Sequence, residues 1–213
     1  MKLFLAVLWC TMVAVFCGCD ADRVTPPSPA SQNPYKALTS KDDVLFNLQL
    51  LYPQYDCVEY NQVLDDDLIF FFSKDDIGTG FTEFAKSDEI RTLQHIGDDS
   101  RPDRVLSIEL TLSYSEEEWT PITPEDQKYA GETWYQKTVV YNMIIQAVPD
   151  MTFVCTDVNA QFTIREGENN SGKKIWRIIR WRDAIKGGSA RSLVAGSAQV
   201  QTTTWGAIKA VYH

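Results

Sequence analysis

The chain has few of the residues from which metal and redox sites are built. It contains only two histidines, His95 and His213, and five cysteines among 213 residues. Two histidines are too few for a histidine-rich metal site, which excludes that class of centre. No third glycine follows Gly78 and Gly80 at the spacing that a dinucleotide-binding loop requires. We therefore predict no metal ion and no cofactor.

Basic residues are outnumbered by acidic ones. The chain has 20 Lys and Arg against 29 Asp and Glu, and a formal net charge of −9. Nucleic acids and anionic lipid surfaces attract clustered positive charge. The acidic balance therefore argues against a nucleic-acid partner and against electrostatic docking on a membrane. The run Asp65–Asp67 lacks the glycine and the spacing of a calcium-binding loop, and we expect it to be a solvated break between two elements.

The first residues form a targeting signal. Lys2 is followed by the apolar run Leu3–Gly18 and then by Cys19. The run is shorter than the about 20 residues of a transmembrane helix. A basic residue, an apolar run and a small residue at its end are the order of an export signal. With a cysteine directly after it, the segment resembles a bacterial lipoprotein signal, although Phe16 stands where leucine is usual. The alternatives are an ordinary secretory signal and an uncleaved anchor.

This resemblance implies a domain organisation and a location. Residues 1–18 would be removed, and Cys19 would carry the lipid. Residues 19–36 are rich in proline and predict a flexible tether. The remainder predicts a folded domain over 37–184, followed by a Gly/Ser-rich linker and an amphipathic helix within 185–213. We expect a protein of the bacterial cell envelope, outside the cytoplasm and held to a membrane by acyl chains such as palmitate.

The two cysteines that remain besides Cys19 leave two alternatives open. In an oxidising compartment, Cys57 and Cys155 could form a disulfide that closes a long loop. The other alternative is two small buried thiols. The choice depends on the distance between the two Cα atoms, which the sequence does not contain.

Hydrophobic spacing predicts helices at both ends of the domain. Thr39 or Ser40 can cap a first helix with an apolar face, Pro53 should kink or end it, and Asp56 can cap a short second helix. A third helix is predicted from Ser87 to about Ile96. At the end of the chain, Thr204 is a plausible cap for a helix with one apolar stripe, formed by Trp205, Ile208 and Tyr212. This stripe favours a helix docked on its own domain over a tail that binds a partner.

The middle of the chain predicts strands. Residues 68–72 form an apolar run that is typical of a buried strand, and residues 105–113 alternate between apolar and polar. Three further β-rich segments lie at about 133–147, 152–165 and 174–183. In the middle one of these three segments, alternation places four apolar residues on one face: Val154, Val158, Phe162 and Ile164.

The order of these elements resembles that of a known superfamily. Two helices, a strand, a helix and then a long antiparallel run ending in Trp176–Asp183 are similar to nuclear transport factor 2-like proteins, which include ketosteroid isomerase-like and polyketide cyclase-like domains. The resemblance covers about residues 37–184. It implies an α+β fold in which a curved antiparallel sheet wraps around the N-terminal helices to form a cone. Enzymes, binding modules and scaffolds share this fold, so the fold does not select a function.

The isomerase-like members of the superfamily use a buried carboxylate as general base, because burial raises its pKa toward a usable value. The candidates in this chain are Asp67, Glu109, Asp157 and Asp183, and each is more readily explained as a solvated or paired side chain. Asp183 would pair with a neighbouring arginine or cap the strand end. His95 is another candidate base, with a satisfied surface histidine as the simpler interpretation. No motif matches a catalytic dyad of the superfamily, so we assign no catalytic residue.

Several aromatic residues could line a pocket in such a cone, and packing explains most of them equally well: Tyr52, Tyr55, Trp134, Tyr135 and Tyr141. The leading hypothesis is therefore a lipid-anchored, non-catalytic protein that binds a small apolar ligand or a protein partner through its cone. The alternatives are a small-molecule isomerase, dehydratase or cyclase with one buried carboxylate, and a homodimeric scaffold.

Overall fold

A computed structural model describes residues 33–73, 80–114, 118–183 and 199–213. The predicted signal, Cys19 and most of the predicted tether lie outside the described residues. The residues from Tyr35 to His213 belong to one compact unit, which includes the C-terminal helix as well as the domain predicted over 37–184. None of the helices within the described ranges is long and apolar enough to cross a membrane.

The first two helices begin where the sequence places their caps. Helix α1 spans Lys41–Gln54, and Ser40 and Asp43 form a capping box at its start. Helix α2 spans Cys57–Val63 and is capped by the side chain of Asp56. Helix α3 spans Lys86–Ile96. These caps satisfy backbone N–H groups that a helix leaves without partners in its first turn. The three predicted helices are therefore confirmed, and α1 ends one residue after Pro53.

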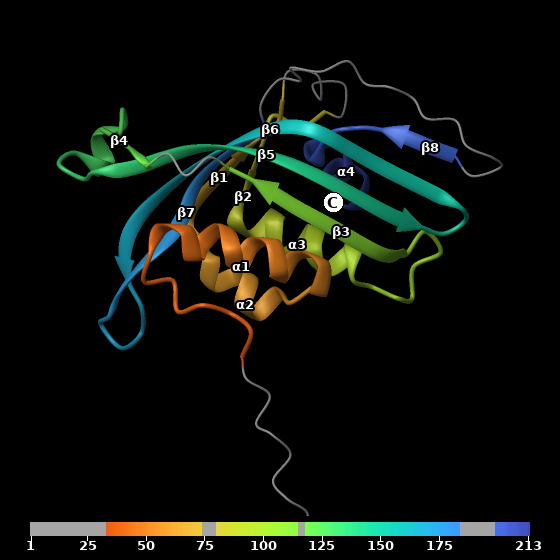
Figure 1. Ribbon diagram of the computed structural model, residues 1–213, viewed down its shortest axis with the longest axis horizontal. Coiled ribbons are helices and arrows are strands. Elements are labelled where there is room, and N and C mark those ends of the chain that lie inside the picture. Colours follow the sequence, from red (N-terminus) through yellow and green to blue (C-terminus); the bar gives the residue numbers. More distant parts are fainter. Residues whose placement is uncertain (1–32, 74–79, 115–117, 184–198) are drawn as a thin grey trace, which may run out of the picture. The chain divides into compact units, whose positions relative to one another are not determined.

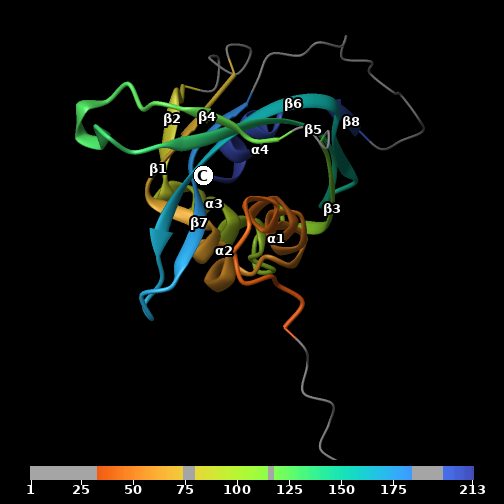
Figure 2. The same cartoon turned by 60° about the vertical axis from the view of Figure 1, so that its left-hand side comes forward.

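The strands form one curved, open sheet. They are β1 (Leu64–Phe71), β2 (Glu83–Ala85), β3 (Val105–Ser113), β4 (Thr120–Ile122), β5 (Trp134–Ala147), β6 (Met151–Glu168), β7 (Lys174–Asp183) and β8 (Gln199–Thr202). The main order is β2-β1-β7-β6-β5-β3, with β4 paired to β5 and β8 paired to β6. The sheet curves over the helices (Figures 1 and 2). The predicted α+β class and the curved sheet around N-terminal helices are confirmed.

Two strand pairs differ from the predicted antiparallel arrangement. Strands β1 and β7 run parallel, and so do β6 and β8. Strand β6 is long enough to have two partners on the same side, because its first residues pair with β8 and its later residues pair with β7. The sheet is therefore mixed, and β8 was not predicted from the sequence.

A bulge in β6 reverses the alternation of its side chains. Tyr141 lies opposite Val158, whereas Met143 lies opposite Cys155, so β6 contains one extra residue between these pairs. Asp157 lies between Cys155 and Val158, and its φ of 50° is in the left-handed region. Such a bulge shifts the residues that precede it to the other face. The predicted shared face of Val154 and Val158 is therefore wrong: Cys155 is buried on the concave side, and Val154 is half-buried.

The run of three aspartates belongs to a strand. Strand β1 starts at Leu64, and the side chain of Asp65 is buried. Nε and Nη2 of Arg165 donate to the two carboxylate oxygens of Asp65 at 2.8 and 2.7 Å. The prediction of a solvated break is wrong for Asp65. Arg165 of β6, which is 100 positions later in the chain, binds its carboxylate through two hydrogen bonds.

We expect Asp65→Asn to lower the free energy of unfolding by about 2 kcal/mol, because a bidentate, largely buried contact to Arg165 loses its charge. Asp66→Asn is the matched control, since the Asp66 side chain is 91% exposed. Urea unfolding of both variants measures the difference. Equal stability of the two variants would contradict a structural role for the Asp65–Arg165 pair.

Candidate functional site

The C-terminal helix lies inside the cone. Helix α4 spans Trp205–Tyr212, and the Thr204 side chain caps it by accepting from the Ala207 N–H. It lies between the concave face of the sheet and α3 (Figures 1 and 2). Trp205, Ile208 and Tyr212, the three residues of the predicted stripe, are each at most 1% exposed. The expectation that this helix docks on its own domain is confirmed.

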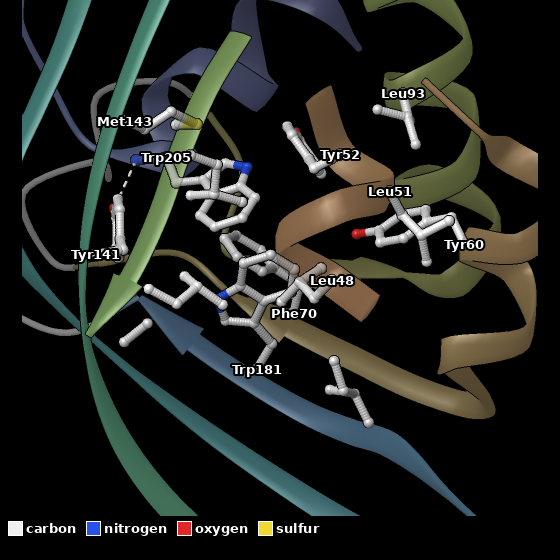
Figure 3. Close-up of a cluster of buried hydrophobic side chains, with 14 of the residues drawn as sticks. Leu48, Leu51, Tyr52, Tyr60, Phe70, Leu93, Tyr141, Met143, Trp181 and Trp205 are labelled. Carbon is white, nitrogen blue, oxygen red and sulfur yellow. Dashed lines mark hydrogen bonds between the residues drawn. The ribbon is translucent and has the colours of Figure 1, made fainter. Parts of the chain in front are cut away.

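The Trp205 indole fills the space between α1 and the sheet. Its ring centroid lies 4.6 Å from that of Tyr52 on α1 and 4.3 Å from that of Trp181 on β7. Both contacts are edge-to-face, the arrangement that favours aromatic pairs. Figure 3 shows Trp205 within this cluster of buried side chains. The space in which a pocket was expected is therefore occupied by the chain itself.

The candidate base Asp183 anchors the start of α4. The Gly206 N–H donates to one Asp183 oxygen at 2.8 Å, and the Tyr141 hydroxyl donates to the other at 3.1 Å. The Tyr141 oxygen in turn accepts from the Trp205 N–H at 2.9 Å (Figure 3). Burial, followed by the charge of Asp183, raises the pKa of Tyr141 well above its ordinary value. Asp183 therefore joins the start of α4 to Tyr141 of β5, a role that the sequence did not indicate.

A second buried carboxylate holds the middle of α4. The Lys209 ammonium lies 2.8 and 2.7 Å from the two carboxylate oxygens of Glu89 on α3, and both side chains are at most 1% exposed. The Tyr60 hydroxyl also donates to Glu89. The ammonium lies 3.5 Å from the ring centroid of Phe70 and 3.9 Å from that of Trp181. Burial lowers the pKa of Lys209, and the charge of Glu89 opposes that change.

Both histidines form polar contacts at the C-terminal end of α4. Nδ1 of His95 lies 2.9 Å from the carbonyl oxygen of Tyr212, to which it donates. Nε2 of His213 lies 3.3 Å from an Asp88 oxygen, and its ring lies 4.4 Å from the Phe84 ring. His95 therefore has a structural partner, in agreement with the simpler interpretation of this residue.

The structure does not bring the other candidate carboxylates together. Glu109 and Asp157 are exposed. Asp67 is part of β1 and pairs with Lys128 at 2.7 Å and with Arg165 at 3.1 Å. Of the four candidate carboxylates, only Asp183 is buried inside the cone.

The structure has both Cys57 and Cys155 as thiols. Cys57 is half-buried at the start of α2, and Cys155 is buried in β6. The two are not joined by a disulfide. Burial, followed by the charge of Asp56, raises the pKa of the Cys57 thiol.

A cavity lies at the mouth of the cone, and we call it the mouth groove. Its volume is about 780 Å³. Its lining residues belong to the start of α1, to the described residues between β3 and β4, and to strands β4, β5 and β7: Ser40, Lys41, Asp42, Tyr114, Glu118, Trp119, Pro121, Tyr135, Lys137 and Trp176.

Two lysines of the mouth groove lie over aromatic rings. The Lys41 ammonium is 3.3 Å from the ring centroid of Tyr135 and 5.2 Å from that of Trp176. The Lys137 ammonium is 4.9 Å from the ring centroid of Tyr114 and 5.3 Å from that of Trp119. These distances are those of cation–π contacts. The groove therefore has two aromatic walls, each with an ammonium group beside it.

Asp42 joins these walls at the start of α1. Its Oδ1 accepts from the Trp119 indole N–H at 2.8 Å and from the Lys137 ammonium at 3.2 Å. Burial by itself would raise the pKa of Asp42, but the two hydrogen bonds outweigh it and lower the pKa below the ordinary value. The carboxylate is therefore ionised at neutral pH.

Sequence reasoning found little of this groove. Among the five aromatic residues predicted as pocket walls, only Tyr135 lines it, whereas Tyr52 and Tyr141 pack around α4. Trp134 lies outside the main core, packed with Tyr129 and Ile179. Strand alternation in β5 could have placed Lys137 beside Tyr135. The two residues are two positions apart, so their side chains lie on the same face of the strand.

Comparisons with known proteins were made at the levels of sequence and structure. No family model matches the chain, and no curated protein matches its sequence. Solved structures similar to this chain include a conserved protein from Planctomyces limnophilus (TM-score 0.43, 13% identity, 67% of this chain and 91% of that one). They also include a putative scytalone dehydratase from Novosphingobium aromaticivorans (TM-score 0.43, 11% identity, 66% and 78%). An NTF2-like protein from Cytophaga hutchinsonii is similar as well (TM-score 0.35, 14% identity, 67% and 96%).

We expect Lys209→Met to lower the free energy of unfolding by about 3 kcal/mol, because it leaves the Glu89 carboxylate buried without its cation. Adding Glu89→Leu should restore most of that loss, since no unpaired charge then remains. Lys174→Met is the control, because its pair with Glu166 is exposed and should contribute under about 1 kcal/mol. Urea unfolding measures all variants. A double variant less stable than Lys209→Met alone would contradict this account.

Proposed function

We propose that this domain is a non-catalytic binding module of the cell envelope, and that its ligand binds in the mouth groove. The observation that carries the proposal is the position of α4. The carboxylates that we find buried inside the cone, Asp183 and Glu89, both bind this helix. The polar groups that converge on an open cavity lie instead at the mouth.

The arrangement inside the cone does not favour general-base chemistry. A general base must come within hydrogen-bond reach of the proton that it removes, directly or through one water. The two Asp183 oxygens already accept from Gly206 and Tyr141, and α4 occupies the adjacent space. A substrate would have to displace α4 before it could reach Asp183. A binding role at the mouth requires no such change.

The mouth groove has the features of a small-molecule site. Its volume of about 780 Å³ falls within the range of about 300–1,000 Å³ that is typical of ligand pockets. Aromatic side chains form much of its lining, and a few polar groups converge on it. Tyr135 and Trp176, which are half-buried and meet edge to face at 5.4 Å, could contact a flat ligand. We therefore place a ring-bearing ligand against this pair.

The membrane attachment is part of the same proposal. The order of Lys2, the apolar run and Cys19 supports lipidation of Cys19. The proline-rich residues that follow support a tether between the lipid and the domain. Acyl chains would then be the membrane contact of this acidic protein.

We expect Cys19→Ala to move the protein from the membrane fraction to the soluble fraction, because the variant cannot receive the acyl chains. Fractionation of cells and the mass of the intact protein measure the change. Cys57→Ala is the control for loss of a cysteine elsewhere. A Cys19→Ala protein that is cleaved and still sediments with membranes would contradict the lipid anchor.

We expect Trp176→Ala to weaken the binding of indole, used as a flat ring probe, by about tenfold, because one wall of the groove is lost. Phe46→Ala is the control, since Phe46 is an exposed aromatic residue of α1 outside the groove. Fluorine NMR of the protein labelled with 5-fluorotryptophan reports which of the five tryptophans beyond residue 18 respond. Indole that shifts Trp205 and leaves Trp119 and Trp176 unchanged would contradict the proposed site.

A further inference from the structure

The charged side chains that the structure describes in the mouth groove are equal in number for each sign. Lys41 and Lys137 contribute two ammonium groups, and Asp42 and Glu118 contribute two carboxylates. A cationic or an anionic ligand would therefore meet a group of its own sign, as well as one of the opposite sign. Desolvating a charge that lacks a dedicated partner is unfavourable. The lining thus selects against a ligand that carries a net charge.

The polar groups of the groove also select against a purely apolar ligand. Lys137 is 8% exposed, and its ammonium points to Asp42 at 3.2 Å. Both side-chain contacts that the structure gives for Asp42 are on Oδ1. Within the described residues Oδ2 has no hydrogen-bond donor, and the Asp42 side chain is 57% exposed. An apolar ligand that covered Oδ2 would remove its water without replacing the hydrogen bond, which is costly.

The carboxylate is held in place before any ligand binds. Trp119, whose side chain is itself buried, fixes Oδ1 through its indole N–H. The Asp42 backbone belongs to the first turn of α1, which the Ser40–Asp43 capping box stabilises. Oδ2 is therefore a positioned acceptor for a hydroxyl group, and a preorganised acceptor costs little ordering on binding.

The aromatic walls of the groove can contact the faces of a ring. A saturated ring with several hydroxyls has faces made of C–H groups and an edge made of O–H groups. The faces suit the Tyr135–Trp176 pair, and the edge suits Asp42 as acceptor and the ammonium groups as donors. Lys41, whose ammonium now lies over Tyr135, is half-buried and on a flexible stem, so it can turn to a hydroxyl oxygen.

We propose that the ligand of the mouth groove is a neutral saccharide, recognised through aromatic stacking and a hydroxyl bound to Asp42. This inference rests on the groove being the binding site. It replaces the small apolar ligand of the sequence-based hypothesis by one that satisfies the polar groups at the cone mouth. Because the groove is open to solvent, we expect affinities in the millimolar range for a single sugar unit.

The test uses the full chain, solubilised in a detergent without a sugar headgroup and labelled with 5-fluorotryptophan. The probes are methyl glucoside, methyl glucuronide and methyl glucosaminide, which share a ring and differ in charge. We expect the neutral glucoside to shift the fluorine signals of Trp119 and Trp176, and to bind at least about threefold more tightly than either charged analogue. Indole serves as the apolar probe of the same groove.

Asp42→Asn tests the acceptor. It should weaken glucoside binding by about tenfold, because a charge-assisted hydrogen bond is replaced by a neutral one, and it should leave indole binding within about twofold. Asp66→Asn is the control at an exposed carboxylate outside the groove. Tighter binding of a charged analogue, or glucoside binding that Asp42→Asn does not change, would overturn the saccharide inference. Indole binding in the groove without any glucoside response would overturn it while leaving the proposed site intact, whereas no response to any probe would remove both.

Discussion

The ion pair between Lys209 and Glu89 is the interaction on which the interior of this domain depends. Both groups are removed from water, so each would carry a desolvation cost of several kcal/mol if it lacked the other. The hydroxyl of Tyr60 and the rings of Phe70 and Trp181 complete the surroundings of the pair. A helix of eight residues is not stable alone in water. Its position is therefore set by these tertiary contacts, together with the hydrogen bonds at its first turn.

The location of α4 has a direct consequence for function. The sequence-based hypotheses placed a ligand or a buried base inside the cone, but Trp205 and Lys209 fill that space. Asp183 accepts from Gly206 of α4 and from Tyr141 of β5, so this candidate base has a structural role. The open surface with polar and aromatic side chains lies instead in the mouth groove, which residues of α1, β5 and β7 help to line. Strand β5 serves both regions, since Tyr141 contacts α4 and Lys137 lines the groove.

Local signals predicted much of the fold and little of the site. The caps Ser40, Asp56 and Thr204 act on backbone groups within three residues, so sequence reasoning located three helix starts from them. The bulge at Asp157 adds one residue to β6, and alternation counted along the strand misassigns every residue before it. The Asp65–Arg165 and Lys209–Glu89 pairs join residues 100 and 120 positions apart. No local pattern contains such partners.

The sequence by itself determined the class of fold, the helix caps, most strands and the apolar stripe of the last helix, because these follow from periodicity and from short-range hydrogen bonding. It also contains the linear pattern on which the proposed lipidation of Cys19 rests. Only the tertiary structure decided that the last helix fills the cone, that Asp183 is its anchor, and that Lys137 and Asp42 meet beside Trp119. These outcomes depend on how strands and helices far apart in the chain approach one another, and the energy of a buried charge depends on the partner that this approach supplies.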